Sequence, residues 1–323
     1  MKVVIAGGTG FLGRALAEAL AVDEHDVVIL TRRHSAQMAR YGGRQVYLVR
    51  WDPDGQVEPW ADEIDGAGAV VNLAGESIGD RRWSKARKAV ILQSRLLATR
   101  SLVAAISAVA ARPTIFVSAS AVGYYGPLDD RIATEDTPPG SDFLANVCVQ
   151  WEGEAVRAAS PRTRVVCIRT GLVLDGTGGA LPRMLIPFRV GLGGRIGSGL
   201  QYWPWIHRQD WVDLVRWTLA TPAVSGPVNA TAPAPVTNME FSRALGRAMH
   251  RPALMPAPAS VLRLILGEMA DGLLLAGQRA MPAKAQRLGF KFRFERVEDA
   301  FAAVFSGRPK AKARRAFHPA SRP

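Results

Sequence analysis

Glycines at the start of the chain have the type and spacing of a phosphate-binding turn. Lys2 to Ala6 is a short apolar, β-branched stretch that predicts a buried strand, and an Ala/Leu-rich helix is expected from Arg14. Glycine lets a pyrophosphate approach the main chain, and the N–H groups at the start of the next helix face the anion. A plain strand-to-helix turn also uses glycine. This placement nevertheless favours a dinucleotide site made by Gly7, Thr9, Gly10, Phe11, Leu12 and Gly13.

Basic residues follow the second predicted strand, Val27 to Leu30. Arg32 lies nineteen residues after Gly13, and no Asp or Glu competes with it there. An acid at this position binds the adenosine ribose hydroxyls of NAD, whereas arginine accommodates the 2′-phosphate of NADP. Arg32 and Arg33 therefore predict NADP(H) as the cofactor, the alternative being two solvated loop arginines. Asp52, after the third predicted strand, is either an acceptor for the adenine amino group or a turn residue.

Small residues follow two later predicted strands and complete the expected cofactor site. The strand at 69–73 ends at Leu73 and is followed by Ala74 and Gly75, whose small size lets the backbone lie against a cofactor. Ser118 follows the strand at 115–117 and is a further candidate contact.

Strands and helices alternate over the first 170 or so residues. Strands are predicted at 2–6, 27–30, 45–49, 69–73, 115–117 and 165–168, and helices at 14–21, 84–110 and 143–159. Such alternation predicts an α/β protein with a doubly wound parallel sheet of the Rossmann type.

The composition changes after Gly171. Residues 175–201 are rich in Gly, Pro and Arg and predict a loop, and apolar helical patterns follow at 239–250, 258–266, 268–280 and 296–305. We expect an NADP-binding domain from 1–174 plus about 203–230. A smaller, mostly helical substrate-binding cap is expected from about 175–202 and 231–307, and residues 308–323 form a basic tail expected to be disordered.

The overall charge and the cysteines limit the classes of protein to which this sequence can belong. The formal net charge is +13, of which the tail supplies six, and no nucleic-acid-reading motif is present in the sequence. The first apolar stretch is too short for a signal peptide or a membrane span, and no later stretch has 18 uninterrupted apolar residues. Cys148 and Cys167 are expected to be core thiols, and no metal-ligand spacing is present. We expect a cytoplasmic monomer or homodimer without a metal, acting on an anionic or sugar-like small molecule.

Several motifs resemble those of a known superfamily. GGTGFLG at the start and SASAVGYYG after the fifth predicted strand resemble the extended short-chain dehydrogenases/reductases, which include nucleotide-sugar epimerases and dehydratases. WEGEA, IRTGLVL, GGAL, WIHRQDWVDLV and the stretch from Leu254 to Phe290 are similar to "epimerase family" proteins with a C-terminal domain of unknown function. The resemblance implies an NADP-dependent oxidoreductase or a nucleotide-sugar epimerase.

The resemblance also shows what this chain lacks. In the superfamily, a serine near the end of strand five and a Tyr-x-x-x-Lys pair on the next helix move the proton that accompanies hydride transfer. Ser120 matches the serine, with Ser118 as the fallback. Leu144 and Cys148 stand where the tyrosine and lysine belong, and residues 127–165 contain neither residue type. A positioned acid or base is typically worth roughly 10²- to 10⁴-fold in rate, so its replacement matters.

Other residues are candidates for the proton donor. Tyr124 is the first choice, and Tyr125, Glu76 and His207 are further ones, although packing, capping or structural hydrogen bonds also explain each of them. Contacts to an anionic substrate are open to Arg169, Thr170, Arg183, Arg195 and Gln201, unless they serve as structural or solvated residues. Two hypotheses follow: an oxidoreductase or epimerase with a non-standard proton relay, or a non-catalytic NADP(H)-binding sensor.

Overall fold

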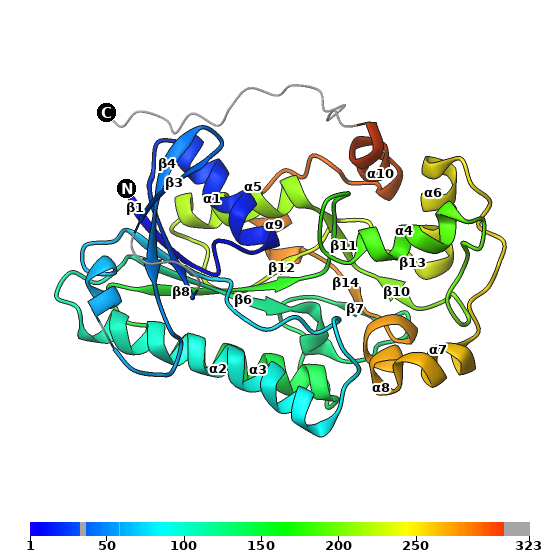
Figure 1. Ribbon diagram of the computed structural model, residues 1–323, viewed down its shortest axis with the longest axis horizontal. Coiled ribbons are helices and arrows are strands. Elements are labelled where there is room, and N and C mark those ends of the chain that lie inside the picture. The colour runs from blue at the N-terminus through cyan, green and yellow to red at the C-terminus, as the bar shows by residue number, and fades with distance from the viewer. Residues whose placement is uncertain (33–36, 58, 307–323) are drawn as a thin grey trace.

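An eight-stranded sheet forms the centre of the computed structural model, which describes residues 1–32, 37–57 and 59–306 (Figure 1). Arg33 and the basic tail at 308–323 lie outside the described residues. The strand order is β12-β8-β6-β5-β1-β2-β4-β3, and all neighbours are parallel except β3 and β4. The strands are β1 Lys2–Ala6, β2 Asp26–Thr31, β3 Gln37–Tyr41, β4 Arg44–Arg50, β5 Ala69–Asn72, β6 Ile115–Ala121, β8 Arg164–Thr170 and β12 Gly226–Ala230.

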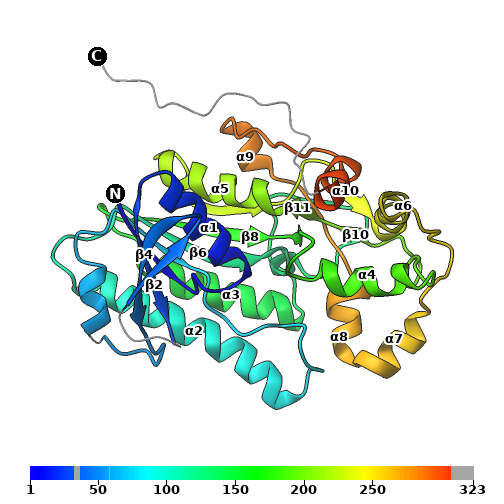
Figure 2. The same ribbon diagram turned by 45° about the horizontal axis from the view of Figure 1, so that its top comes forward.

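Helices cover both faces of this sheet. The helices α1 (Phe11–Val22) and α5 (Arg208–Ala220) lie side by side on one face, and α2 (Lys85–Ala108) and α3 (Phe143–Val156) lie on the other (Figures 1 and 2). Each face has its own apolar core, the first around Leu16 and Trp211 and the second around Leu102 and Phe116. The predicted doubly wound α/β class is confirmed.

The strand order reverses at β1, which lies between β2 and β5. At such a switch point the connections leave in opposite directions, which opens a crevice at the carboxyl ends of the two strands. The glycine turn after β1 and the Leu73 segment after β5 lie against each other at this switch point.

A second, mostly helical part lies beside the carboxyl ends of the strands (Figure 2). It contains α4 (Leu181–Arg189), α6 (Asn238–Met249), α7 (Ala259–Leu266), α8 (Glu268–Ala270), the π turn η3 (Asp271–Leu275) and α10 (Val297–Ser306). Its core joins Trp205, Phe241 and Phe301. The short helix α9 (Ala283–Arg287) returns to the sheet and contacts β12.

Short elements connect the two parts. They are η2 (Val122–Tyr125) and the paired strands β7 (Ile132–Ala133) with β14 (Arg279–Ala280), β9 (Leu172–Leu174) with β11 (Trp205–His207), and β10 (Tyr202–Trp203) with β13 (Val236–Thr237). The short helix η1 (Pro59–Glu63) instead packs against α2 on the sheet.

Three predictions of local structure were wrong. The loop expected at 175–201 contains α4, whose Leu181, Leu185 and Phe188 are buried at helical spacing while Pro182 lies in the first turn. The helix expected at 268–280 ends at Leu275 and is followed by β14. The strands β3 and β12 were not predicted; β12 contains Pro227, which an edge strand tolerates.

Helix α2 is long and apolar enough to cross a membrane, by length and composition alone. In the structure it packs against α3, and 44% of the apolar stretch is buried. The core helix of a folded domain meets the same criteria.

Candidate functional site

The turn after β1 is built so tightly that two of its glycines cannot be replaced. Gly7 has φ +78°, and a Cβ there would lie 2.9 Å from the main-chain carbon and oxygen of Leu73. A Cβ at Gly13, inside the first turn of α1, would overlap the carbonyl oxygen of Gly7. The N–H of Gly10 donates to that same oxygen at 3.0 Å. The turn therefore depends on glycine at Gly7 and Gly13 for its shape.

The first turn of α1 offers main-chain donors to an anion. Gly10 caps the helix without a side-chain hydrogen bond, and the described residues provide no other side-chain cap. The N–H groups of Phe11 and Leu12, at the first positions of the helix, have no intrahelical acceptor. Thr9 and Gly10 are exposed, so a ligand can reach the turn. A diphosphate fits the open helix end and the glycine backbone.

The segment after β5 lies directly against this turn. Leu73 N donates to Ala6 O at 2.9 Å, and Ala74 N donates to the buried Asn72 Oδ1 at 3.1 Å. Asn72 is itself held by Thr99 at 3.0 Å. Gly75 is exposed at the end of this ordered segment. Leu73 and Ala74 thus lie against the glycine turn, and the contact of Leu73, Ala74 and Gly75 with a cofactor stays a prediction.

Arg32 stands at the carboxyl end of β2 beside this crevice. Its side chain is 64% exposed, and its Nη2 lies 3.5 Å from Oε1 of Glu76, which is 33% exposed. The other oxygen of Glu76 lies 3.5 Å from Arg87. Glu76 is thus shared by two guanidinium groups and is not positioned as an isolated acid. Asp52 is paired with Arg50 at 3.2 Å at the next strand end.

A buried ion pair lies at the ends of β6 and β8. Arg169, 3% exposed, donates to both oxygens of Glu152 on α3, at 2.8 and 2.9 Å. Ser120 Oγ donates to Glu152 Oε1 at 2.6 Å. Because the carboxylate only accepts, the hydroxyl proton of Ser120 points to Glu152 and its lone pairs remain for another donor. Ser118 is fully buried, and its hydroxyl donates to Ala119 O at 3.3 Å.

The two tyrosines after β6 have different surroundings. The ring of Tyr124 stacks on the guanidinium of Arg169 at 3.4 Å from the ring centre, and the residue is half-buried. The Tyr125 hydroxyl accepts from Arg169 at 3.0 Å and donates to Asn229 Oδ1 at 2.7 Å. Burial raises the pKa of Tyr125 to about 12. Tyr125 is therefore a neutral structural phenol, and Tyr124 is the more accessible of the two.

Neither replacement on α3 acts as the usual proton relay. Cys148 is buried, with its Sγ 3.7 Å from Ala121 O, and burial raises the pKa of its thiol to about 11. It remains protonated at neutral pH. Leu144 contacts the Gly123 backbone on one side, where a Cβ on Gly123 would lie 3.3 Å from the Leu144 Cβ, and lines a cavity on the other.

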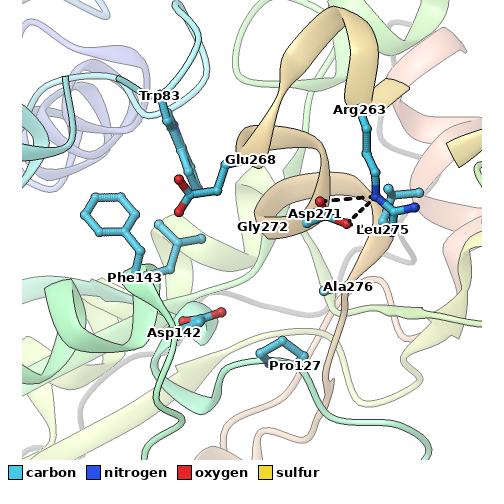
Figure 3. Close-up of a pocket in the computed structure, with 11 residues that line it drawn as sticks. Trp83, Pro127, Asp142, Phe143, Arg263, Glu268, Asp271, Gly272, Leu275 and Ala276 are labelled. Atoms are coloured by element: carbon cyan, nitrogen blue, oxygen red, sulfur yellow. Dashed lines mark hydrogen bonds and ion pairs between the residues drawn. The ribbon is translucent and has the colours of Figure 1, made fainter. Parts of the chain in front are cut away.

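This cavity, of about 310 Å³, lies between α3 and the helical part (Figure 3). Trp83 and Phe143 stand on one side and η3 on the other. Leu144 occupies the position expected of the catalytic tyrosine, so the cavity adjoins the place where that tyrosine would act. The lining residues are Trp83, Pro127, Asp142, Phe143, Leu144, Arg263, Glu268, Asp271, Gly272, Leu275 and Ala276.

Other candidates from the sequence have structural partners. His207 caps α5 by accepting from Gln209 N at 3.1 Å, and burial lowers its pKa to about 4. Arg183 binds Asp80 at 2.6 Å, and Arg195 donates to the carbonyl of Gly197 at 2.7 Å. None of these is among the residues that line the cavity.

Two further candidates are also held by main-chain or neighbouring groups. Gln201 donates to the carbonyls of Ile196 and Leu274, and Thr170 accepts from Trp211 Nε1 at 3.1 Å. Within the described ranges, His, Cys, Asp and Glu form no group able to hold a metal ion.

Sequence reasoning named Ser120, Tyr124, Arg169 and Leu144 but missed other residues around the buried ion pair and the cavity. Glu135 accepts from the N–H groups of Asn229 and Lys284 at 3.0 and 3.1 Å, which joins the sheet to the start of α9. Trp83 and Gly272 meet across 189 residues of sequence, where no local pattern signals their contact. Only Glu152 carried a signal, through the motif WEGEA.

The sequence matches two family models. That of the NAD dependent epimerase/dehydratase family matches residues 3–230, and that of a domain of unknown function, DUF1731, matches residues 257–304. An epimerase family protein of Mycobacterium tuberculosis is 43% identical over 300 residues, 92% of this chain and 95% of the relative. An Arabidopsis thaliana relative described as chloroplastic is 40% identical over 309 residues, 94% of this chain and 86% of the relative.

A similar fold is found in the crystal structure of a human protein. The human epimerase family protein SDR39U1, solved with NADPH, has a TM-score of 0.85 and 35% identity, and the match covers 95% of this chain and 99% of that chain.

Proposed function

The chain belongs to the NAD dependent epimerase/dehydratase family, and on that basis we propose that it is an NADP(H)-dependent oxidoreductase. The observation that carries the proposal is the sheet's switch point, where a helix end without a side-chain cap and an exposed arginine lie at the ends of the neighbouring strands β1 and β2. The human relative solved with NADPH supports it.

The proposed cofactor contacts follow from the geometry. The glycine turn, with Thr9, Gly10, Phe11, Leu12 and Gly13, binds the diphosphate through main-chain N–H groups. Arg32 binds the 2′-phosphate after leaving Glu76, and Arg33, outside the described residues, is proposed to assist. The remaining contacts are proposed for Asp52, Leu73, Ala74, Gly75 and Ser118. Bound NADP(H) supplies or accepts a hydride at its nicotinamide ring.

The chain's own residues must then handle the proton. Ser120, held by Glu152, presents its lone pairs to a substrate hydroxyl and orients it. Tyr124 is proposed as the proton donor, because it is the more accessible of the two tyrosines and its ring is held in place by stacking on the Arg169 guanidinium. Glu152 and Arg169 are positioning residues, since their ion pair fixes both Ser120 and the Tyr124 ring.

We propose that the two predicted domains have different roles. Residues 1–174 with about 203–230 bind the cofactor, and about 175–202 with 231–307 form the substrate part. The short helix α9, which falls within the second of these ranges, contacts β12 of the central sheet. The cytoplasmic location and the monomeric or homodimeric state stay predictions.

The test is NADPH oxidation followed at 340 nm with a panel of ketones and aldehydes. We expect turnover that Ser120→Ala and Tyr124→Phe each reduce by roughly 10²-fold or more. Tyr202→Phe is the matched control, since its ring contacts Arg279 in the helical part. Tight NADPH binding without turnover of any carbonyl compound would overturn the oxidoreductase assignment in favour of the sensor.

A further inference from the structure

The cavity beside α3 has an aromatic wall. Trp83 and Phe143 form an edge-to-face pair with ring centres 5.2 Å apart, and Leu144 and Leu275 extend the apolar lining (Figure 3). The indole Nε1 of Trp83 donates to Ile78 O at 2.8 Å, so its one polar atom is already bonded to the protein. The wall therefore presents ring faces and methyl groups, which favour a flat, apolar guest.

The position of this wall is fixed by a glycine on the opposite side. A Cβ on Gly272 would lie 2.8 Å from the outer ring atoms of Trp83 and 3.9 Å from Leu144 Cδ1. The indole thus packs directly on the backbone of η3. The two sides of the cavity are in contact at this point, which limits the thickness of a bound ring.

The charges around the cavity do not suit a polyanion. Its lining contains three carboxylates, Asp142, Glu268 and Asp271, and one guanidinium, Arg263. Arg263 is already paired with Asp271 at 3.0 Å. A diphosphate bound here would meet more negative than positive groups, and it would have to displace the partner of the single arginine.

The cations just outside the lining are mostly engaged as well. Lys88 pairs with both oxygens of Glu268 at 2.8 and 2.9 Å, and its ammonium lies 5.2 Å from the Phe143 ring centre. The Arg82 guanidinium lies across Gly267 at the edge, outside the lining residues. Asp142 uses one oxygen to accept from Ala145 N at 2.8 Å, which leaves the other as an acceptor.

Building on the proposed oxidoreductase, we propose that this cavity binds an uncharged, flat ring compound bearing a hydroxyl group, and not a nucleoside-diphosphate sugar. The ring lies against Trp83 and Phe143. Its hydroxyl donates to the free oxygen of Asp142 or to Glu268, because carboxylates are strong acceptors. The volume of about 310 Å³ accommodates one fused ring system at the lower end of the range of ligand pockets.

Binding of two probes to the full chain tests this inference without any turnover. Naphthol represents the proposed class and UDP-glucose the excluded one, and both are titrated by calorimetry. We expect saturable binding of naphthol and no binding of UDP-glucose. Trp83→Ala should weaken naphthol at least tenfold. Trp217→Ala, which removes an indole packed on Phe290 on the other face of the sheet, is the matched control and should leave it unchanged.

Two further variants keep the inference testable if the Trp83→Ala protein does not fold. One fills the cavity, and the other tests the role of its carboxylates. Leu144→Trp fills the cavity from α3 and should also abolish naphthol binding. The double variant Glu268→Gln with Asp271→Asn releases Lys88 and Arg263 and should show saturable UDP-glucose binding, which the wild type lacks.

Three results would overturn the inference: naphthol binding unaffected by both Trp83→Ala and Leu144→Trp, UDP-glucose binding by the wild type that Trp83→Ala removes, or no gain of UDP-glucose binding in the double variant. An NADPH titration of the same preparations tests the proposed function separately. If NADPH does not bind, the proposed function is refuted, but the naphthol titration still tests the proposal for the cavity.

Discussion

Arg32 and Glu76 should change cofactor affinity in opposite directions when each is neutralised. Arg32→Ala removes a guanidinium that would bond the 2′-phosphate, and hydrogen bonds to charged groups are worth about 1.5–3 kcal/mol. In the free protein Arg32 is paired with Glu76 at 3.5 Å and is 64% exposed. The wild type must break this exposed pair when it binds NADPH, at a cost of about 0–1 kcal/mol, and Arg32→Ala has no pair to break. The net loss of binding free energy for NADPH is then about 0.5–3 kcal/mol, or roughly 2- to 160-fold in affinity.

Glu76→Gln gives the complementary result. A phosphate bound to Arg32 would lie within about 7 Å of the Glu76 carboxylate, and the screened repulsion between them is about 0.5–1 kcal/mol. Removing this charge should tighten NADPH binding by roughly two- to fivefold. NADH lacks the phosphate, so neither substitution should change its affinity by more than about twofold.

The assay is calorimetric titration of each protein with NADPH and with NADH. Arg44→Ala is the matched control, because Arg44 forms an exposed pair with Glu24 at 3.7 Å and lies at the amino end of β4, whereas Arg32 follows the carboxyl end of the parallel strand β2. It should leave both affinities unchanged. Equal losses for the two cofactors in Arg32→Ala, or weaker NADPH binding in Glu76→Gln, would refute the assignment of Arg32 to the phosphate.

Three further variants test the scaffold. Gly13→Ala should lower the free energy of unfolding by about 1–3 kcal/mol and weaken NADPH binding, because its Cβ overlaps Gly7 O. The control Gly153→Ala, whose Cβ would meet nothing within 4 Å, should do neither. Chemical denaturation and a parallel NADPH titration measure both effects, and an unaffected Gly13→Ala would contradict the turn geometry. Glu152→Gln should cost about 3–5 kcal/mol in urea unfolding by leaving Arg169 buried without its counter-charge, and a loss below 1 kcal/mol would exclude a structural ion pair. His207→Asn keeps a capping side chain but removes an imidazole whose pKa burial lowers to about 4. Because the fold favours the neutral imidazole, its contribution to the free energy of unfolding is complete above pH 6.5 and is lost as the pH falls. Between pH 6.5 and 4 the wild type should therefore lose up to about 3 kcal/mol more than the variant, whereas parallel pH profiles would contradict this.

A nearby carboxyl group titrates over the same pH range as His207. Burial raises the pKa of Asp210 to about 7, although the N–H groups of Arg293 and Phe294 donate to it at 2.9 and 3.0 Å. Its contribution has the opposite sign and is lost as the pH rises toward 7. Because both proteins contain Asp210, this contribution cancels in the difference between wild type and His207→Asn.

The sheet could be predicted from sequence because its signals are local. The apolar stretch before Gly7 and the glycines after it specify a strand, a turn and a helix without reference to the rest of the chain. Helix α4 was missed because Gly, Pro and Arg conceal the spacing of Leu181, Leu185 and Phe188. Edge strand β12 was missed because Pro227 argues against a strand unless its place at the edge is known.

The site could be predicted only in part for the same reason. Residue types identified Ser120 and Tyr124 as candidates, but not the bond from Ser120 to Glu152 or the stacking of Tyr124 on Arg169. These contacts join strands and helices that are far apart in sequence. The cavity likewise requires α3 and η3 to come together, which only the tertiary fold specifies.

The most direct test of the central claim is a calorimetric titration of the wild-type chain with NADPH and with NADH. The arrangement of the glycine turn and Arg32 predicts one saturable site with NADPH bound at least about tenfold more tightly than NADH. No heat with either dinucleotide, or equal affinity for both, would contradict it.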